Sequence, residues 1–390
     1  AGNGDHQGFG RVGGDGVMAK LGEVCKVSPS TKNIERQGAW LLNLDMVEQQ
    51  TGRVIEYKYV GEDDLNGSII QFDTENVLYS KLRPNLNKVV LPPKDGFSTS
   101  ELLPLRPDAS VLNKDYLAAF LRSDSFVTWA VSKTAGAKMP RLGTKDLMNA
   151  EIPVPSIEQQ KKIAEKFKKL EQLISLRKQQ LAKLDELVKA RFVEMFGERS
   201  SIRPQKLKEV TRRVKVGFVG TCEKYYTDNT GVPMLRTTNI TSHGIDLKDL
   251  KYVTRTFHEK NLKSRVHKGD LLIARHGSNG QANVYCGDEA QCLNAIIIEP
   301  DHNITNPIFL ENLINSRSVK RQIEKELVGS TQHVLNTTTL ANVEVKIPAI
   351  KEQQVFAAFV ERVDQQKQTV QQSLEKLELL KKALMQEYFG

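Results

Sequence analysis

The chain carries the same junction between a strand and a long helix twice, at positions 193 residues apart. The first copy, EIPVPSIEQQKKIAEKFKKL, begins at Glu151, and the second, EVKIPAIKEQQVFAAFVERV, begins at Glu344. In each copy proline ends a short apolar strand, because proline has no N–H group to donate to a neighbouring strand. A repeat of this length predicts two halves with the same fold.

The match extends through both halves when residue i is compared with residue i + 193. NKDYLAAFLRSDSFV at Asn113 corresponds to NPIFLENLINSRSVK at Asn306, whereas the middle parts, near 40–75 and 225–260, hardly match. Similar flanking segments with different middle parts predict two similar domains that bind different targets.

Each half combines short strands with one or two helices before the long helix. Apolar runs predict the strands, and a period of about 3.6 residues predicts the helices. The expected strands lie at 68–72, 76–80, 270–274 and 295–299, and the expected helices at 114–124 and 307–317. Each half should therefore contain a mixed α/β domain of roughly 130 residues.

A helix of about 40 residues is expected after each junction, with apolar residues alternating by four and three positions. Eight of the ten positions in each ladder are apolar, which is typical of a coiled-coil seam. The alternative, in which each helix lies on its own domain, would need a wider apolar face. The residues predicted for the helix-pair interface are Ile163, Phe167, Leu170, Ile174, Leu181, Leu184, Val188, Phe356, Val360, Val363, Val370, Leu374, Leu377 and Leu384.

The order of these parts predicts an α+β fold in which two similar globular domains lie at opposite ends of a pair of long helices. The first helix enters the second domain, so the second helix must run back antiparallel to pack against it, and the duplication implies pseudo-twofold symmetry. The expected boundaries are a tail at 1–17 ahead of a start at Met18, domain one at 18–155, the first helix at 156–197, domain two at 198–348 and the second helix at 349–390.

The composition narrows the class of protein. The net charge of +9 and the pI near 9.2 favour a polyanionic partner. No apolar run approaches the roughly 18 residues needed to span a bilayer, and no signal peptide is visible, so a cytoplasmic protein without a membrane partner is expected. The four cysteines (Cys25, Cys222, Cys286 and Cys292) lack metal-ligand or paired spacing, which fits a reducing compartment.

Two catalytic alternatives rest on short motifs. NPIF at Asn306 is similar to the Asn-Pro-Pro-aromatic loop of adenine methyltransferases, but it lacks the second proline and no Gly-rich methyl-donor site precedes it. Asn306 is expected instead to cap a helix, with Pro307 at the first helical position. The nuclease-like set Asp301, Glu344 and Lys346 recurs in the first half as Asp108 and Glu151, but with Pro153 in place of the lysine.

No Walker lysine, Ser-His-Asp pattern or metal-ligand motif is present in the sequence, which therefore favours a binding protein. A methyltransferase or nuclease with a built-in recognition domain, or a scaffold that binds DNA without specificity, remains the alternative.

Both halves contain loops dense in side chains that contact base edges and phosphates. Arg and Lys suit guanine and phosphate, and Asn and Gln suit adenine, although Asn, Gly and Ser also make turns. Such loops occur at matching positions of both halves, as SKLRPNLNK at 80–88 and ARHGSNGQ at 274–281. The residues predicted to bind DNA are Lys81, Arg83, Asn85, Asn87, Lys138, Arg141, Arg236, Thr237, Asn239, Arg275, His276, Ser278, Asn279, Gln332 and His333.

The whole pattern resembles the specificity (S) subunit of type I restriction–modification systems. The resemblance covers essentially all of residues 18–390, and its most specific features are IEQQKKIA (Ile157–Ala164) and KEQQVFAA (Lys351–Ala358) after a proline-ended strand. Each long helix also closes in an aromatic–Gly pair, Phe196–Gly197 and Phe389–Gly390.

The resemblance implies a subunit without catalytic activity. Each target-recognition domain would read one half of a split, asymmetric site in double-stranded DNA, and the helix pair would set the unread spacer. Two modification (M) subunits, which carry the S-adenosylmethionine site, would dock on it, and restriction (R) subunits would supply ATP- and Mg²⁺-dependent cleavage.

Overall fold

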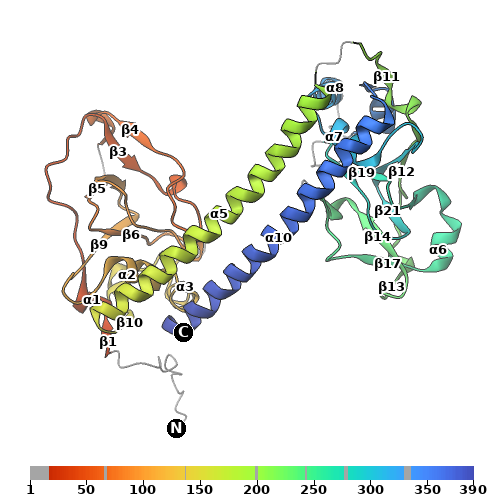
Figure 1. Cartoon of the computed structure of the whole chain (residues 1–390). Coiled ribbons are helices and arrows are strands. Elements are labelled where there is room, and N and C mark those ends of the chain that lie inside the picture. Colours follow the sequence, from red (N-terminus) through yellow and green to blue (C-terminus); the bar gives the residue numbers. More distant parts are fainter. Residues whose placement is uncertain are drawn as a thin grey trace, which may run out of the picture. The chain divides into compact units, whose positions relative to one another are not determined.

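The computed structural model describes residues 17–65, 68–136, 138–197, 201–241, 244–275, 280–328 and 335–390. The chain divides into two compact units, unit 1 (residues 1–179 and 371–390) and unit 2 (residues 180–370). Each unit contains one domain and parts of the long helices α5 (Ile157–Phe196) and α10 (Ile350–Phe389) (Figure 1). Both helices have 40 residues, which confirms their predicted length.

Two four-stranded sheets form the domain of unit 1. The order of the antiparallel sheet is β2-β9-β6-β7, and that of the second sheet is β4-β3-β8-β5, in which β3 and β8 are parallel. The strands are β2 (Cys25–Val27), β3 (Ala39–Leu42), β4 (Lys58–Val60), β5 (Ile69–Phe72), β6 (Val77–Ser80), β7 (Val89–Val90), β8 (Gly96–Thr99) and β9 (Leu102–Pro107).

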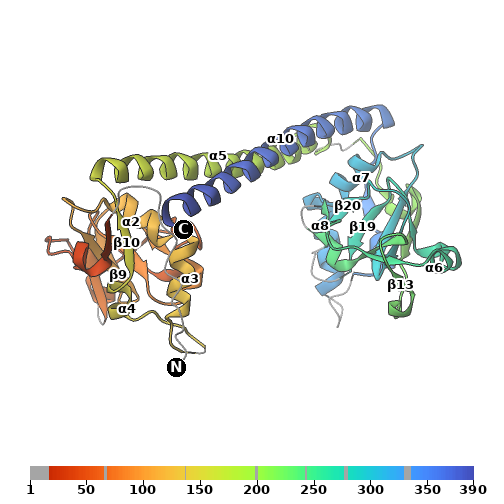
Figure 2. The ribbon, with the colours of Figure 1, turned by 90° about the horizontal axis from the view of Figure 1, so that it is seen from below.

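Short helices connect this domain to α5. They are α1 (Leu21–Val24), α2 (Lys114–Leu121), α3 (Asp124–Ser132) and α4 (Thr144–Met148), with the three-residue turn η3 (Pro84–Leu86) after β6 and the acidic turn η2 (Glu62–Leu65) after β4. A two-stranded ribbon pairs β1 (Val17–Lys20) with β10 (Glu151–Val154) just before α5. The apolar helix α2 lies between α5 and the sheet that contains β6 and β9, and its buried side chains join the main core (Figure 2).

The domain of unit 2 has an antiparallel sheet, β12-β22-β19-β20, and a five-stranded sheet, β13-β17-β14-β21-β18. The strands are β12 (Thr211–Val216), β13 (Tyr226–Thr227), β14 (Val232–Arg236), β17 (Lys251–Val253), β18 (Arg265–Val266), β19 (Leu271–Ala274), β20 (Ala282–Val284), β21 (Ala290–Leu293) and β22 (Ala295–Pro300). Two ribbons pair β11 (Gln205–Lys206) with β23 (Glu344–Val345) and β15 (Ile240–Thr241) with β16 (Gly244–Ile245).

The helices of this domain are α6 (Arg255–Lys260), α7 (Pro307–Ile314), α8 (Arg317–Val328) and α9 (Thr337–Ala341), and the turn η6 (Thr237–Asn239) follows β14. The four strands expected from the sequence are present as β5, β6, β19 and β22, and the two expected helices as α2 and α7. The predicted mixed α/β class of both domains is confirmed.

The middle parts of the halves share one topology although their sequences hardly match. The order β4-β3-β8-β5 corresponds strand for strand to β17-β14-β21-β18, and the central pair is parallel in both sheets. The register agrees to the residue, because Ala39 faces Val60 in unit 1 and Val232 faces Val253 in unit 2. Only the alternation of buried and exposed residues is needed to keep such a register, so many sequences satisfy it.

The start of α2 and that of α7 are capped in the same way. The Asn113 side chain accepts a hydrogen bond from Tyr116 N, and the Asn306 side chain accepts from Ile308 N and Phe309 N. Pro307 occupies the first helical position. The expected helix start at Asn306 is confirmed, and the methyltransferase-like NPIF motif has this structural explanation.

A buried glutamine in the first turns of each long helix holds the chain that leads into α2 or α7. Gln160 Oε1 accepts from Asn113 N at 2.8 Å, and Gln353 Oε1 accepts from Asn306 N at 2.8 Å. The contacts make Gln160 equivalent to Gln353. An alignment that matches the letters EQQ pairs residues 157–164 with residues 351–358. The contacts show that this alignment is shifted by one residue.

In unit 1, the start of α5 lies beside the end of α10. Phe167 stacks on Phe389 with ring centroids 5.8 Å apart, and Phe389 also contacts Tyr116 and Phe120 of α2 at 5.3 and 5.8 Å. The Ser125 hydroxyl donates to the Phe389 carbonyl at 2.6 Å. The two helices are thus antiparallel here, and the end of α10 belongs to the core of the first domain.

Unit 2 repeats this arrangement with the other ends of the helices. Phe192 and Phe196 of α5 lie 5.8 and 5.0 Å from Phe309 of α7, and 5.4 and 5.6 Å from Phe356 of α10. Near their ends, the long helices therefore have the wider apolar face that packing against a domain requires. Each domain packs against the start of its own helix and the end of the other.

All the apolar ladder residues are buried or half-buried, as a seam between two helices requires. The buried ones are Phe167, Leu170, Leu184, Val188, Phe356, Val360, Val363, Val370 and Leu374, and the half-buried ones are Ile163, Ile174, Leu181, Leu377 and Leu384. Two charged ladder positions have acidic partners on α5, because Lys367 binds Asp185 at 2.7 Å and Lys381 binds Glu171 at 2.9 Å.

Glu311 of α7 is a buried carboxyl group close to the charges of α10. Its Oε1 accepts a hydrogen bond from Val284 N at 3.0 Å. Burial raises the pKa of Glu311 from 4.5 to about 7; the Val284 hydrogen bond and Lys367 oppose this shift, and Asp364 adds to it.

Replacing Glu311 with glutamine is expected to stabilise unit 2 at alkaline pH. Because the pKa of Glu311 is higher in the folded chain, stability falls as the pH rises from about 4.5 to about 7 and stays lower above that. This shift corresponds to at most about 3 kcal/mol. Urea unfolding should show nearly equal stability of the parent and Glu311→Gln at pH 5, and a more stable variant at pH 8. Equal stability at both pH values would contradict the raised pKa.

Candidate nucleic-acid interface

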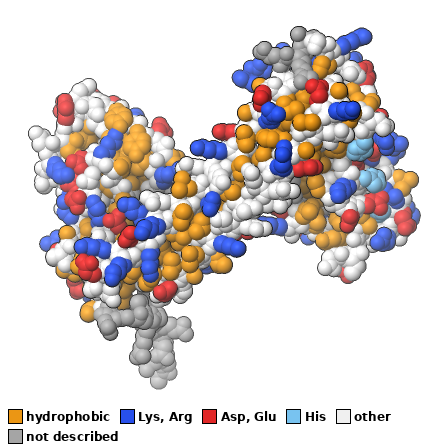
Figure 3. Space-filling model, viewed as in Figure 1, with side chains coloured by type: hydrophobic (Ala, Val, Ile, Leu, Met, Phe, Trp, Pro, Cys, Tyr) orange, Lys and Arg blue, Asp and Glu red, His pale blue; other side chains and the backbone are white. Residues whose placement is uncertain are grey.

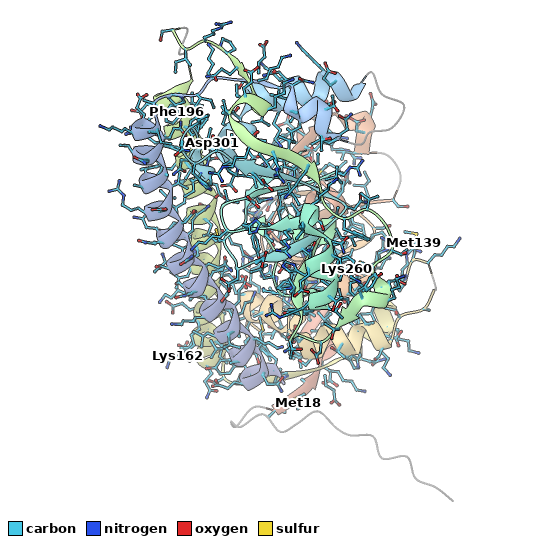
Figure 4. The ribbon with its side chains drawn as sticks, turned by 90° about the vertical axis from the view of Figure 1, so that its right-hand side faces the viewer. Met18, Met139, Lys162, Phe196, Lys260 and Asp301 are labelled. Carbon is cyan, nitrogen blue, oxygen red and sulfur yellow. The ribbon has the colours of Figure 1, made fainter. Side chains whose placement is uncertain are left out.

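The structure brings together the two segments of domain one that were predicted to bind DNA. The turn between β6 and β7 (residues 81–88) lies against the segment at 138–142. Arg83 N donates to Pro140 O at 2.7 Å, and Leu142 N donates to Lys81 O at 2.9 Å. Met139 of this loop is exposed, and Figure 4 shows it at the edge of unit 1 opposite Lys162 of α5.

A third segment of domain one, which was not predicted from the sequence, joins these two. Val47 and Val54 pair across a hairpin whose tip carries Gln50. Gln50 N donates to Leu86 O at 3.1 Å, and Gln50 Nε2 donates to Asn85 O at 3.1 Å. The three segments form one continuous surface, here called the domain-one loop cluster (residues 47–54, 81–88 and 138–142).

Cations without acidic partners lie on the domain-one loop cluster. Arg83 and Lys138 are exposed and Lys81 is half-buried, and no ion pair is found for them among the described residues. Arg141 differs, because its guanidinium binds Glu101 at 2.9 Å. Asn85 is exposed as well. Arg83, Lys138 and Asn85 are therefore placed where DNA could reach them.

Asn87 has a structural role instead. It is buried in a left-handed conformation (φ 50°), and its Nδ2 donates to Arg122 O at 3.0 Å. Gly280 occupies the equivalent place in domain two with φ 67°, so the turn needs a residue that tolerates positive φ. The structure does not support Asn87 as a base-reading residue.

Asn239 of domain two is also buried, at 2% exposure. Its Oδ1 accepts from Arg236 N at 3.0 Å, and its Nδ2 donates to Asp246 O at 3.1 Å. The amide therefore closes the turn η6 and cannot face DNA. Arg236 is held by Asp249, with 3.0 Å between the charged groups, and Thr237 is half-buried beside it.

Arg275 follows β19 as Lys81 follows β6. Leu335 N donates to Arg275 O at 3.2 Å, as Leu142 N does to Lys81 O, so the frame of the loops is the same in both domains. The Arg275 guanidinium binds Asn294 Oδ1 at 3.0 Å. The remaining predicted residues, His276, Ser278, Asn279, Gln332 and His333, lie outside the described residues.

The two aspartates of the nuclease-like sets have structural roles. Asp108 Oδ1 accepts from Ser110 N, and Asp301 Oδ1 accepts from Asn303 N, each at 3.0 Å, so both aspartates shape the turn after their strand. The described residues contain no group of three or more His, Cys, Asp or Glu that could hold a metal ion. Within the same residues, no helix is long and apolar enough to cross a membrane.

Both halves of the chain are similar to known proteins. The family model for the type I restriction modification DNA specificity domain matches residues 17–186 and 215–379. The MjaVIII specificity subunit of Methanocaldococcus jannaschii is 24% identical over 315 residues, which are 75% of this chain and 73% of that protein. The EcoDI specificity subunit of Escherichia coli is 27% identical over 124 residues, and the match spans 32% of this chain but only 27% of its length.

Solved structures share the fold. The S subunit of a type I restriction-modification system from M. genitalium has a TM-score of 0.61 at 14% identity, covering 96% of both chains. A chain from a study of complex assembly and conformational transition of the type I R-M system has a TM-score of 0.57 at 17% identity, covering 98% of this chain and 99% of that chain. The resemblance inferred from the sequence is confirmed, and this chain belongs to the family of type I restriction modification DNA specificity domains.

Proposed function

We propose that the chain is the specificity subunit of a type I restriction–modification complex and that each domain reads one half of a split, asymmetric site in double-stranded DNA. One observation carries the proposal: the family match covers both domains, and their loops share a backbone arrangement but differ in their side chains. The chain itself is then a recognition subunit without catalytic activity.

The helix pair serves in this proposal as the spacer between the half-sites and as the docking site for two modification subunits. Exposed leucines off the seam support the docking role, because Leu187 of α5 and Leu380 of α10 are equivalent residues. Exposed lysines, Lys183 and Lys376, precede them by one turn in both helices. Two equal patches suit two copies of one partner.

The other components belong to partner subunits in this proposal. S-adenosylmethionine would bind to the modification subunits, and ATP and Mg²⁺ would serve the restriction subunits. The complex would act on DNA in the cytoplasm.

Selection from random-sequence DNA tests the proposed function. The full chain with its modification subunits should enrich one sequence with two specified parts and a fixed unspecified spacer. Methylation mapping in the source genome should find methylated adenine in the same sequence. Enrichment of no sequence, with uniform binding, would instead indicate a scaffold that binds DNA without specificity.

Arg83→Ala is expected to damage reading of the first half-site only. Arg83 is exposed in the domain-one loop cluster without an ion pair among the described residues, so its guanidinium is available to a base or a phosphate. A base contact should cost about 1–3 kcal/mol and relax one position in a competition assay. Lys145→Ala, at an exposed lysine of α4, is the control for lost charge. Equal weakening on target and random DNA would reassign Arg83 to the phosphate backbone.

A further inference from the structure

Three alternating side chains of unit 1 form an exposed apolar stripe. Ile55, Tyr57 and Tyr59 are 57%, 46% and 57% exposed and alternate along the chain that runs into β4, and Lys94 Nζ lies over both tyrosine rings, so these two rings share a face. Figure 3 shows hydrophobic side chains exposed on unit 1 over the region of β3 and β4. A contiguous exposed apolar patch marks an interaction site.

Lys94 holds its charge among the rings of this stripe. Its Nζ lies 4.3 Å from the ring centroid of Tyr59, 4.9 Å from that of Tyr57 and 5.2 Å from that of Trp40. Nζ also donates to the Tyr59 hydroxyl. No acidic partner of Lys94 is found in the described part of the chain. The rings therefore fix a cation at the surface by cation–π attraction, and the cation is not neutralised.

The acidic residues nearest to Lys94 in the sequence and the sheet do not pair with it, and Asp95, which follows it in the chain, binds Lys32 at 3.2 Å instead. Glu56 lies between Ile55 and Tyr57 in the sequence, and no ion pair between it and Lys94 is found among the described residues. The turn η2 packs through Leu65 with Leu41 and Val60, on the face opposite to Trp40. The tyrosine face therefore carries the lysine without a matching carboxylate.

The stripe continues the domain-one loop cluster. Ile55 N donates to Met46 O at 2.9 Å, directly beyond the Val47–Val54 pair, and the tip of this hairpin binds the turn at residues 83–87. The stripe and the exposed Arg83 therefore belong to connected segments of one domain.

Domain two lacks the tyrosine stripe and its lysine, although the strands of its sheet have the same register. Tyr252 stands in the place of Tyr59, but Pro233 replaces Trp40 and Leu250 replaces Tyr57. At the start of the next strand, Asp288 replaces Lys94. Two domains that share one fold but read different half-sites must differ at the residues that contact bases. The group formed by Tyr57, Tyr59 and Lys94 is one such difference between the two domains.

We propose that Tyr57, Tyr59 and Lys94 form a DNA-contact surface that helps to specify the first half-site. The inference rests on the proposed function. The tyrosine rings and Ile55 would cover the apolar groups that duplex DNA exposes, the thymine methyl and the deoxyribose, and Lys94 would donate to a base-edge oxygen beside them.

Selection from random-sequence DNA with the full chain and its modification subunits tests the surface. The variants are Tyr57→Ala with Tyr59→Ala, and Lys94→Met, which removes the charge but keeps a hydrocarbon chain over Trp40. Both should keep the spacer and the second half-site, relax at least one position of the first, and bind the parent site at least tenfold more weakly. Tyr252→Ala, at the equivalent position of domain two, should leave the first half-site unchanged.

The outcomes separate the inference from the proposed function. If the parent chain selects a split site and the two test variants select the same site with unchanged affinity, the surface does not contact DNA and the inference is wrong. Equal weakening on every sequence would also overturn it, because the surface would then only hold the backbone. If the parent chain selects no split site, the proposed function itself fails, and the inference fails with it.

Discussion

Phe389→Ala is expected to lower the stability of unit 1 by about 3–5 kcal/mol. Phe389 is 3% exposed although it is the penultimate residue of the chain, and its ring lies among Tyr116, Phe120 and Phe167. Removing the ring leaves a cavity between α2, α5 and α10, where close packing gives little scope for collapse.

Hydrogen exchange during urea titration can localise this loss. Amides of α2 and of the β6–β9 pair should lose protection at lower urea in Phe389→Ala, while those of unit 2 should keep it. Leu379→Ala is the matched control, because Leu379 is on the same helix but 69% exposed, and its loss should change stability by less than about 0.5 kcal/mol. An equal, small effect of both substitutions would show that the end of α10 is not part of the domain core.

The seam between the long helices could be predicted because it repeats at a fixed period. The second apolar face near the helix ends was not predicted, because it is short: Phe192 and Phe196 in α5, and Met385 and Phe389 in α10, each follow a ladder position by one residue. Only the position of Phe309 in one domain and of Phe120 in the other shows what these rings pack against.

The candidate interface was predicted less completely than the fold. Arg and Lys in a polar loop predicted exposed cations, and Arg83 and Lys138 are exposed. Asn was ambiguous, because the residue that suits adenine also suits turns: the Asn239 amide closes η6, and Asn87 takes the positive φ of its turn while its Nδ2 donates to Arg122 O. The tyrosine stripe lies in the middle part of the half, where the comparison of halves hardly aligns the residues and gives no signal.

Gln353→Leu is the other substitution with a large expected effect, a loss of at least about 3 kcal/mol in unit 2. Gln353 is fully buried, and its Nε2 donates to Ile304 O at 2.9 Å and to Pro348 O at 2.8 Å, while Oε1 accepts from Asn306 N. Leucine fills a similar volume but leaves these three backbone groups without the glutamine as partner, and each of them that stays shielded from water costs about 1–3 kcal/mol.

The neighbouring glutamine supplies the control. Gln354 is exposed, so Gln354→Leu should change the urea midpoint of unit 2 by little, although it alters the same EQQ motif. Gln160→Leu should reproduce the loss in unit 1, since Gln160 donates to Val111 O and Pro155 O at 2.8 Å. If Gln354→Leu were as damaging as Gln353→Leu, the assignment of the essential glutamine would be wrong.

A glutamate at this position separates lost hydrogen bonds from lost packing. The carboxylate of Gln353→Glu can accept from Asn306 N, but it would face the carbonyl oxygens of Ile304 and Pro348, to which only the protonated acid can donate. The folded-state pKa of the new glutamate should therefore lie above its unfolded value. The stability of Gln353→Glu should then fall as the pH rises through that pKa, while Gln353→Leu should show no such dependence relative to the parent. A pH-independent difference between the two variants would mean that the buried amide acts through its shape alone.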